Sequence, residues 1–214
     1  MRLKSCTFLA NNVEIICSSA FQNCRNIPSA NINCDYAIIY DSVFRCCREL
    51  EQAKFSGVVA EMGGHMFEKC ERLEDVKLPE GMTEIKEEFF AGCTSLTDVN
   101  IPDSVKHIKG WAFSDCTSLE DVKIPNQVRK IEDFAFVYCK KLNNVILPDS
   151  VRELGYYAFS DCSNLTNVSI GNRLTKIEEN AFLNCDKLKE IQFEPDVNKD
   201  IQKQLKEEYP YVEF

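Results

Sequence analysis

The sequence predicts an α/β repeat solenoid built from 23-residue turns, and three recurring residue types support this fold class. Phenylalanine returns at a constant interval, at Phe21, Phe44, Phe67, Phe90, Phe113, Phe136, Phe159 and Phe182. A cysteine follows each phenylalanine by three residues, at Cys24, Cys47, Cys70, Cys93, Cys116, Cys139, Cys162 and Cys185. An aliphatic residue follows by six, at Ile27, Leu50, Leu73, Leu96, Leu119, Leu142, Leu165 and Leu188. Such a period is the signature of stacked repeats, in which each turn buries its apolar side chains against the next.

Each turn is predicted to hold one short strand. Val122-Lys123-Ile124 alternates apolar and polar residues, and Pro125 then ends the strand because proline lacks the N–H that a ladder needs. The rest of a turn has room for a few extended residues and one short helical turn around the Ala-Phe-x-x-Cys segment. Strands of successive turns would form a parallel sheet with a spacing of about 4.8 Å. Because parallel strands joined by crossovers wind right-handed, the sequence predicts a right-handed superhelix.

Two parts are predicted along the chain. Residues 1–193 form the solenoid of about eight turns, and residues 194–214 form a C-terminal capping helix and tail. Within the solenoid, residues 1–66 are degenerate because they keep the period but lose the prolines. Residues 67–193 are the regular body.

The tail is predicted to be an amphipathic helix. The period stops at Pro195, and over 196–209 one helical face carries Val197, Ile201 and Leu205. This helix would cover the last turn of the solenoid. A partner-binding helix is the alternative.

The repeat follows the pattern C-x-x-L-x-x-V-x-I-P-x-x-V-x-x-I-x-x-x-A-F-x-x-C. One copy is Cys93-Leu96-Val99-Ile101-Pro102-Val105-Ile108-Ala112-Phe113-Cys116. With this pattern the chain resembles the BspA-like (Treponema-type) leucine-rich repeat family. The resemblance implies a curved leucine-rich-repeat superhelix with the parallel sheet on its concave face. It also implies a surface or secreted, adhesion-type binding role, and it brings no catalytic residue.

Charge and cysteine usage limit the possible functions. The net charge of −9 argues against nucleic acid, whose binding rests on clustered Lys and Arg. Of the 12 cysteines, the eight in register are interpreted as buried thiols, because none lies in a CxxC or Cys/His pattern with metal-ligand spacing. Four lie outside that register, and whether they are reactive or paired stays open: Cys6, Cys17, Cys34 and Cys46.

Location is left open by the sequence. No secretory signal is apparent, and no stretch reaches the roughly 18 apolar residues of a membrane span. The chain would be cytoplasmic if it is complete, whereas the resemblance implies a secreted or surface protein. We expect a monomer that has no membrane span and needs no cofactor or metal ion.

The outward positions of the strands are the first candidate surface. This strand face, defined by positions eight and ten residues after each phenylalanine, carries Asp75, Asp98, Asp121, Asn144, Lys77, Asn100 and Lys123. It would offer a polar surface to a protein or glycan partner. The alternative is a solvated face on which Asp and Lys neutralise one another across strands. A Ca²⁺ site is disfavoured because stacked carboxylates alone form no ligand cage.

An aromatic column is the second candidate surface. Two residues before the phenylalanine, successive turns carry Trp111, Phe134 and Tyr157. Exposed aromatic clusters often mark interfaces, although rings in this place would also pack between turns. No catalytic residue is predicted, since His65 and His107 fall at different positions of the repeat. The sequence thus predicts a non-enzymatic scaffold for a protein or glycan, with an intracellular protein–protein interaction scaffold as the alternative.

Overall fold

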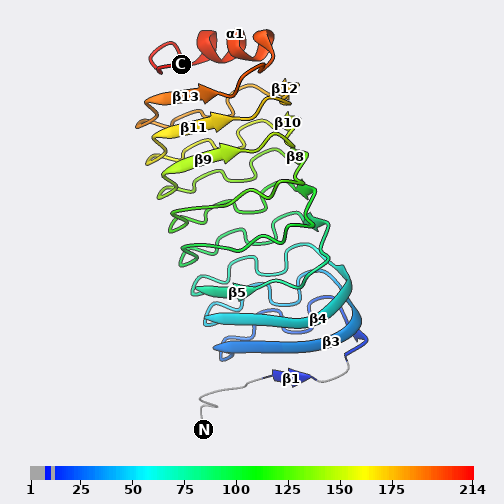
Figure 1. Cartoon of the computed structure of the whole chain (residues 1–214). Coiled ribbons are helices and arrows are strands. Elements are labelled where there is room, and N and C mark those ends of the chain that lie inside the picture. Colours follow the sequence, from blue (N-terminus) through cyan, green and yellow to red (C-terminus); the bar gives the residue numbers. More distant parts are fainter. Residues whose placement is uncertain (1–7, 11–12) are drawn as a thin grey trace.

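The computed structural model describes residues 8–10 and 13–214, which form a coil of stacked turns with the chain termini at opposite ends (Figure 1). One side of the coil carries β1 (Phe8–Ala10), β5 (Asp75–Lys77), β9 (Asn144–Leu147), β11 (Asn167–Ile170) and β13 (Glu190–Phe193). The long strands β3 (Ser29–Ile39) and β4 (Gln52–Met62) begin on this side and end on the second side, where β2 (Ile15–Ile16) pairs with the end of β3. The second side carries β6 (Glu84–Ile85), β7 (His107–Ile108), β8 (Lys130–Ile131), β10 (Glu153–Leu154) and β12 (Lys176–Ile177).

All strand pairs are parallel, and the regular repeats pair with an offset of one repeat. Ser29 lies opposite Gln52, which lies opposite Asp75. On the second side, β6, β7, β8, β10 and β12 form one continuous sheet. The chain is therefore a parallel β-solenoid whose turns correspond to the period of the sequence.

The predicted strand at Val122-Lys123-Ile124 is not formed. Neither 98–101 nor 121–124 belongs to a strand, so β5 and β9 lie in two separate sheets. Val122 is nevertheless only 5% exposed, which agrees with the apolar–polar alternation. The apolar–polar alternation indicates which side chains are buried. Strand pairing also requires the backbones of neighbouring turns to lie within hydrogen-bonding distance, which the alternation does not encode.

The predicted helical turns are hydrogen-bonded turns and not helices. In all but the turn of Cys162, the cysteine N–H donates to the carbonyl of the phenylalanine three residues earlier, as from Cys116 to Phe113 at 3.2 Å. Trp111 and Asp115, which flank this phenylalanine, have φ angles of 53° and 56°. A residue in the left-handed region stops a right-handed helix. Of the described residues, only α1 (Lys199–Glu208) is an α-helix, shorter than the predicted 196–209 because Asn198 caps its first turn.

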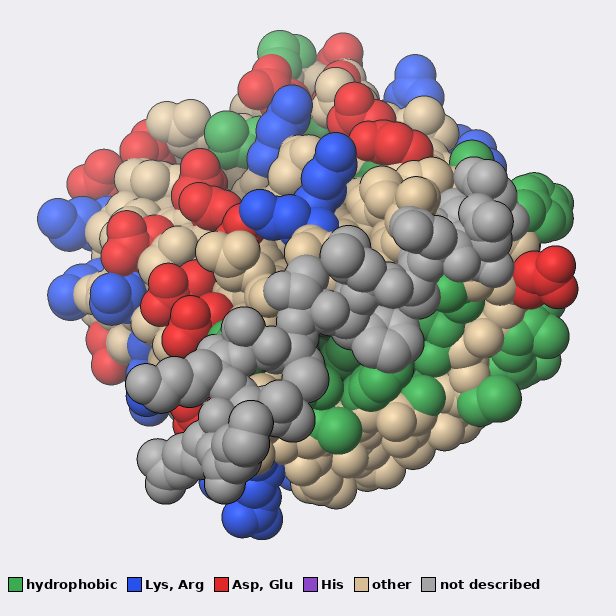
Figure 2. All heavy atoms as spheres, turned by 90° about the horizontal axis from the view of Figure 1, so that it is seen from below, with side chains coloured by type: hydrophobic (Ala, Val, Ile, Leu, Met, Phe, Trp, Pro, Cys, Tyr) green, Lys and Arg blue, Asp and Glu red, His purple; other side chains and the backbone are tan. Residues whose placement is uncertain are grey.

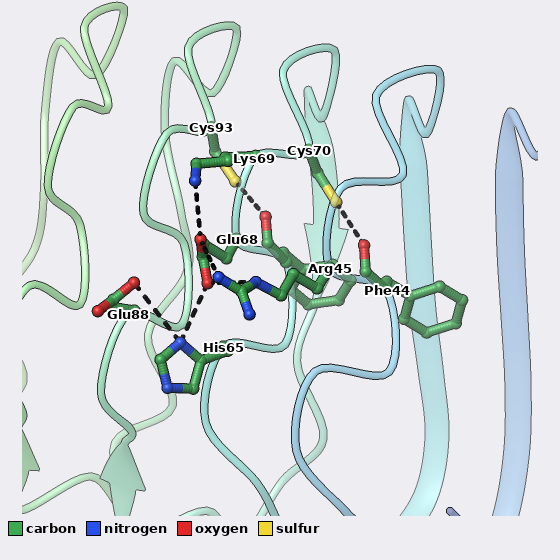
Figure 3. A network of polar contacts seen from close by, with 9 residues as sticks. Phe44, Arg45, His65, Glu68, Lys69, Cys70, Glu88 and Cys93 are labelled. Carbon is green, nitrogen blue, oxygen red and sulfur yellow. Dashed lines mark hydrogen bonds and ion pairs between the residues drawn. The ribbon is translucent and has the colours of Figure 1, made fainter. Parts of the chain in front are cut away.

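Two columns fill the core between the sheets. The phenylalanine rings stack from turn to turn with centroid distances of 4.9 to 5.8 Å. Beside them, each cysteine S–H donates to the phenylalanine carbonyl of the preceding turn, as from Cys70 to Phe44 at 3.1 Å and from Cys93 to Phe67 at 3.2 Å (Figure 3). The prediction of a buried thiol column is confirmed from Cys47 to Cys185, whereas Cys24, in the first turn, is only half-buried.

The cysteines outside that column give a partial answer. Cys17 is exposed and Cys46 is half-buried, and both are free thiols. Cys6 and the side chain of Cys34 lie outside the described residues.

The two ends of the coil differ. Seen from the N-terminal end, hydrophobic side chains gather on one part of the surface (Figure 2), and Ile15, Tyr36 and Tyr40 are exposed in these first turns. At the other end, α1 lies across the last turn (Figure 1) and buries Ile201 and Leu205.

We predict that the solenoid loses stability as pH rises above about 9, the ordinary thiol range. Burial raises the pKa of Cys47 and of Cys185 to about 12, and it raises the pKa of the thiols between them as well. The unfolded chain releases these protons first, so stability is complete below the unfolded pKa and falls as pH approaches the folded pKa. Urea midpoints measured under reductant at pH 8 and pH 10 test this. Cys116→Ala/Cys139→Ala should flatten the fall, and an unchanged slope would assign it to other groups.

Candidate functional site

A repeated backbone arrangement places two rows of side chains on the surface beside the phenylalanine column. In the turns from Ser19 to Tyr138, the N–H groups of the phenylalanine and of the residues two before and two after it donate to carbonyls of the next turn. Trp111 donates to Asp133 at 3.2 Å, Phe113 to Ala135 at 2.7 Å, and Asp115 to Val137 at 2.9 Å. The residues two before and two after the phenylalanine have positive φ in every turn from Ser19 to Asn184. Two outward rows therefore flank the buried phenylalanines along the coil.

The first row includes the aromatic column of Trp111, Phe134 and Tyr157. The ring centroids of Trp111 and Phe134 lie 5.0 Å apart with an interplanar angle of 8°, and those of Phe134 and Tyr157 lie 5.1 Å apart at 5°. The rings thus pack between turns, as the alternative interpretation expected. Trp111 remains 39% exposed, so the column also reaches solvent.

The second row holds Asp115, Tyr138 and Asp161, which we call the acidic row. Between the aromatic column and the acidic row lies a groove of about 390 Å³. Its remaining lining residues come from the position directly after the phenylalanine, and they are Ser114, Val137, Ser160 and Leu183. The groove thus has an aromatic side, an acidic side and mostly small residues between them.

The polar groups of the groove are mainly hydrogen-bond acceptors. Asp161 accepts hydrogen bonds from the Ser160 hydroxyl at 2.5 Å and from the Asn184 amide at 3.0 Å. Ser114 is only 7% exposed, and its hydroxyl, which solvent can reach, forms no hydrogen bond with another described residue. Sequence reasoning missed the acidic row and Ser114. Only their position in the repeat could have pointed to them, because the residues of the acidic row share no chemical type.

The strand face lies elsewhere on the coil. Its seven predicted residues are all exposed: Asp75, Lys77, Asp98, Asn100, Asp121, Lys123 and Asn144. Lys54 forms an ion pair with Asp75 at 2.9 Å, and the Asn167 amide donates to the Asn144 carbonyl oxygen at 2.9 Å. Both contacts run from turn to turn, and the Lys54–Asp75 pair is of the kind that the alternative of a neutralised face describes.

A charged cluster lies beside the phenylalanine column in earlier turns, at the repeat positions that line the groove in later turns (Figure 3). Arg45 contacts the Glu68 carboxylate with Nη2 at 2.9 Å and Nε at 2.7 Å, and Lys69 Nζ lies 3.2 Å from it. His65 Nδ1 lies 3.1 Å from Glu68 and 3.5 Å from Glu88. Burial alone would raise the pKa of Glu68, but hydrogen bonds from Arg45, Lys69 and His65 outweigh it and lower that pKa.

The same cluster contains metal-ligand types. One atom each from His65, Glu68 and Glu88 lie within 4.8 Å of one another. Both oxygens of Glu68 already contact cationic side chains, Oε1 that of Lys69 and Oε2 that of Arg45. A divalent cation would have to compete with two positive charges here, so the cluster is best described as an internally neutralised network.

In the part of the chain that the structure describes, no helix has the length and apolar character needed to cross a membrane. The sequence profile of the BspA type leucine rich repeat region matches six copies over residues 2–120 and 112–205. Among curated proteins, none matches this chain.

Solved structures show the same fold. A leucine-rich repeat protein from Bacteroides ovatus is 27% identical with a TM-score of 0.59, over 85% of this chain and 59% of that one. This chain therefore spans 59% of the length of that relative. The pneumococcal vaccine antigen PcpA is 16% identical with a TM-score of 0.51, over 96% of this chain and 76% of that one. The T. pallidum leucine rich repeat protein is 18% identical with a TM-score of 0.49, over 95% of this chain and 83% of that one.

The 23-residue period, the stacked phenylalanine and thiol columns and the matching profile agree with one another. The chain belongs to the family of BspA-type leucine-rich repeat proteins.

Proposed function

We propose that this chain is a non-enzymatic binding scaffold that recognises a protein or glycan partner through the groove beside the aromatic column. Leucine-rich repeat proteins of this family are typically binding scaffolds. The observation that carries the proposal is the open groove of about 390 Å³, lined by Trp111, Phe134 and Tyr157. Concave sites that combine aromatic walls with a few polar groups are the usual form of a binding site. The exposed strand face is a second contact surface in this proposal.

The biological setting is part of the same proposal. An adhesion-type role at the cell surface or in the secreted state rests on the family resemblance. The alternative, an intracellular interaction scaffold, is supported by the column of free thiols, since reducing compartments keep thiols unpaired. The proposal includes a monomeric chain, a right-handed superhelix with the sheet on its concave face, and residues 194–214 as a cap on a solenoid of residues 1–193. Right-handed winding rests on the rule for parallel crossovers.

Trp111 provides the test, because it is the only tryptophan of the chain and lines the groove. We expect oligosaccharides or peptides that enter the groove to shift the tryptophan emission in a saturable titration. Ser114→Val puts a larger side chain into the groove. The fold should tolerate valine here, because Val137 occupies the same repeat position in the next turn. It should weaken such binding by at least about tenfold, which equals ~1.4 kcal/mol.

The control is Ser169→Val in β11, on the strand face, which should leave the titration unchanged. Unchanged binding in Ser114→Val, together with loss in Asp98→Asn/Asp121→Asn, would contradict the groove as the site and move it to the strand face.

A further inference from the structure

We infer that the partner segment held by the groove is cationic, a stretch of protein chain whose lysine or arginine side chains meet the acidic row. This inference rests on the proposed function, since it names the chemistry of the ligand for the same groove. Four features of the described residues carry it, namely charge balance, an unpaired hydroxyl, ring geometry and backbone conformation.

Charge balance separates the groove from the charged cluster. Trp111, Ser114 and Asp115 occupy the same positions of the repeat as His65, Glu68 and Lys69 two turns earlier. In the earlier turns, the chain neutralises its own carboxylate with Arg45 and Lys69. No Lys or Arg lines the groove, and the Asp115 carboxylate forms no ion pair or hydrogen bond with a side chain or backbone group of the described residues. The acidic row therefore has no counter-charge from the groove itself, and a cationic ligand would supply one.

The groove also keeps a polar group without a partner. Ser114 is 7% exposed and lines the groove. Its hydroxyl forms no hydrogen bond with another described residue, so it is available to a ligand in the groove. A hydroxyl in such a place lowers the free energy of the complex when a ligand donor reaches it. An ammonium or guanidinium group supplies several donors at once.

Ring geometry favours an aliphatic cation over a sugar. Because Trp111, Phe134 and Tyr157 stack on one another at 5.0 and 5.1 Å, the faces between them are covered and mainly their edges meet the groove. A sugar ring stacks on an aromatic face, whereas a lysine stem packs against any apolar wall while its ammonium reaches a carboxylate. Tyr138 is 43% exposed and contacts no other ring in the described chain, so its ring can meet a cation.

The backbone of the acidic row is that of a glycine position. Asp115, Tyr138 and Asp161 have φ angles of 56°, 62° and 59°, and the equivalent residue one turn earlier is Gly92. Aspartate and asparagine tolerate this region, but a tyrosine there is uncommon and costs free energy. A ligand contact made by Tyr138 would account for a ring at this position.

The test uses fluorescein-labelled peptides and the intact chain at low and physiological salt. The cationic probe repeats Lys-Pro-Pro, because a polyproline helix spaces every third residue by about 9 Å. Asp115 and Asp161 are two turns apart, roughly 10 Å along the coil. Matched probes carry Glu-Pro-Pro and Gln-Pro-Pro. We expect saturable binding of the lysine probe alone, measured by anisotropy and by Trp111 emission.

Two double variants of equal charge decide whether the groove is responsible. Asp115→Asn/Asp161→Asn should weaken the lysine probe at least tenfold, and it keeps the fold because Asn23 and Asn184 occupy equivalent positions. Asp98→Asn/Asp121→Asn changes the net charge equally on the strand face and should leave binding within twofold. Equal losses in both variants would overturn the inference, since they would reveal general attraction to a chain of net charge −9.

Tyr138→Gly is a further variant that should keep the fold. Gly92 occupies the same repeat position two turns earlier and has a φ angle of 74°. It should keep the unfolding midpoint and weaken the lysine probe severalfold. Unlabelled neutral oligosaccharides are titrated in parallel against Trp111. If an oligosaccharide shifts the emission and the lysine probe does not bind, the cationic ligand is excluded while the groove keeps its proposed function. If no ligand changes the emission, both proposals fail.

Discussion

Replacing Phe113 by alanine is expected to destabilise the solenoid by about 3–5 kcal/mol. The Phe113 ring is fully buried and stacks on Phe90 at 5.2 Å and on Phe136 at 4.9 Å. Its removal loses the transfer free energy of the ring and leaves a cavity that cannot close, because the backbone of each turn is hydrogen-bonded to both neighbours. Since each turn contacts only adjacent turns, the cavity interrupts the column in the middle of the coil.

Urea unfolding followed by circular dichroism measures this loss. Tyr211→Ala is the matched control, because it also removes an aromatic ring but from a side chain that is 97% exposed. The control should leave the midpoint unchanged. A Phe113→Ala midpoint close to that of the control would contradict a continuous ring column as the source of stability.

Removing the residues after Pro195 is expected to give an aggregating product. Helix α1 and its flanks bury Val197, Ile201 and Leu205 against the last turn. The backbone N–H of Asn180 donates to the Glu208 carboxylate at 2.5 Å, and that of Phe182 donates to the Tyr209 hydroxyl at 3.0 Å. The equivalent donors of the turns from Ser19 to Tyr138 bond to the next turn. Truncation would therefore expose apolar surface and unpaired donors together.

The tail also covers the edge of β13. Ile191 N–H donates to the Glu213 carbonyl, and Glu213 N–H donates to the Lys189 carbonyl, both at 2.8 Å. An uncovered strand edge is a template for pairing with a second chain. Size-exclusion chromatography and light scattering compare the truncated and intact chains. A monomeric truncated product of equal stability would contradict the cap and favour the alternative, a helix that binds a partner.

Tyr209→Phe is a control for the truncation that removes one hydrogen bond of the tail and keeps its apolar contacts. It keeps the ring but removes the hydroxyl that accepts from Phe182, which should cost about 1–3 kcal/mol for an unsatisfied buried N–H. The variant should stay monomeric, because the apolar cover of Ile201 and Leu205 remains.

Much of the core could be predicted from the sequence, because a strict period places equivalent residues in equivalent surroundings. Phe113, Cys116 and Leu119 are all fully buried, as their shared spacing indicated. The aromatic column was also visible in advance, together with the alternative that its rings pack between turns. The stacking distances and the exposure of Trp111 now support both aspects.

The other side of the groove could not be predicted in the same way. Asp115, Tyr138 and Asp161 share no chemical type along their row, so no pattern of one residue class marked them. Their outward direction follows from a left-handed backbone, which a tyrosine does not signal because bulky residues usually avoid it. The unpaired hydroxyl of Ser114 likewise became apparent only once the neighbouring turns were in place.

By itself, the sequence determined the length of the turn, the residues of the phenylalanine and thiol columns, and the family of the chain. The tertiary structure alone decided that 98–101 and 121–124 form no strand and that two surface rows enclose a groove. The physical reason is that burial follows from residue type and period. Strand pairing and the volume of the groove depend instead on the distance between neighbouring turns. That distance results from the packing of all the side-chain columns at once.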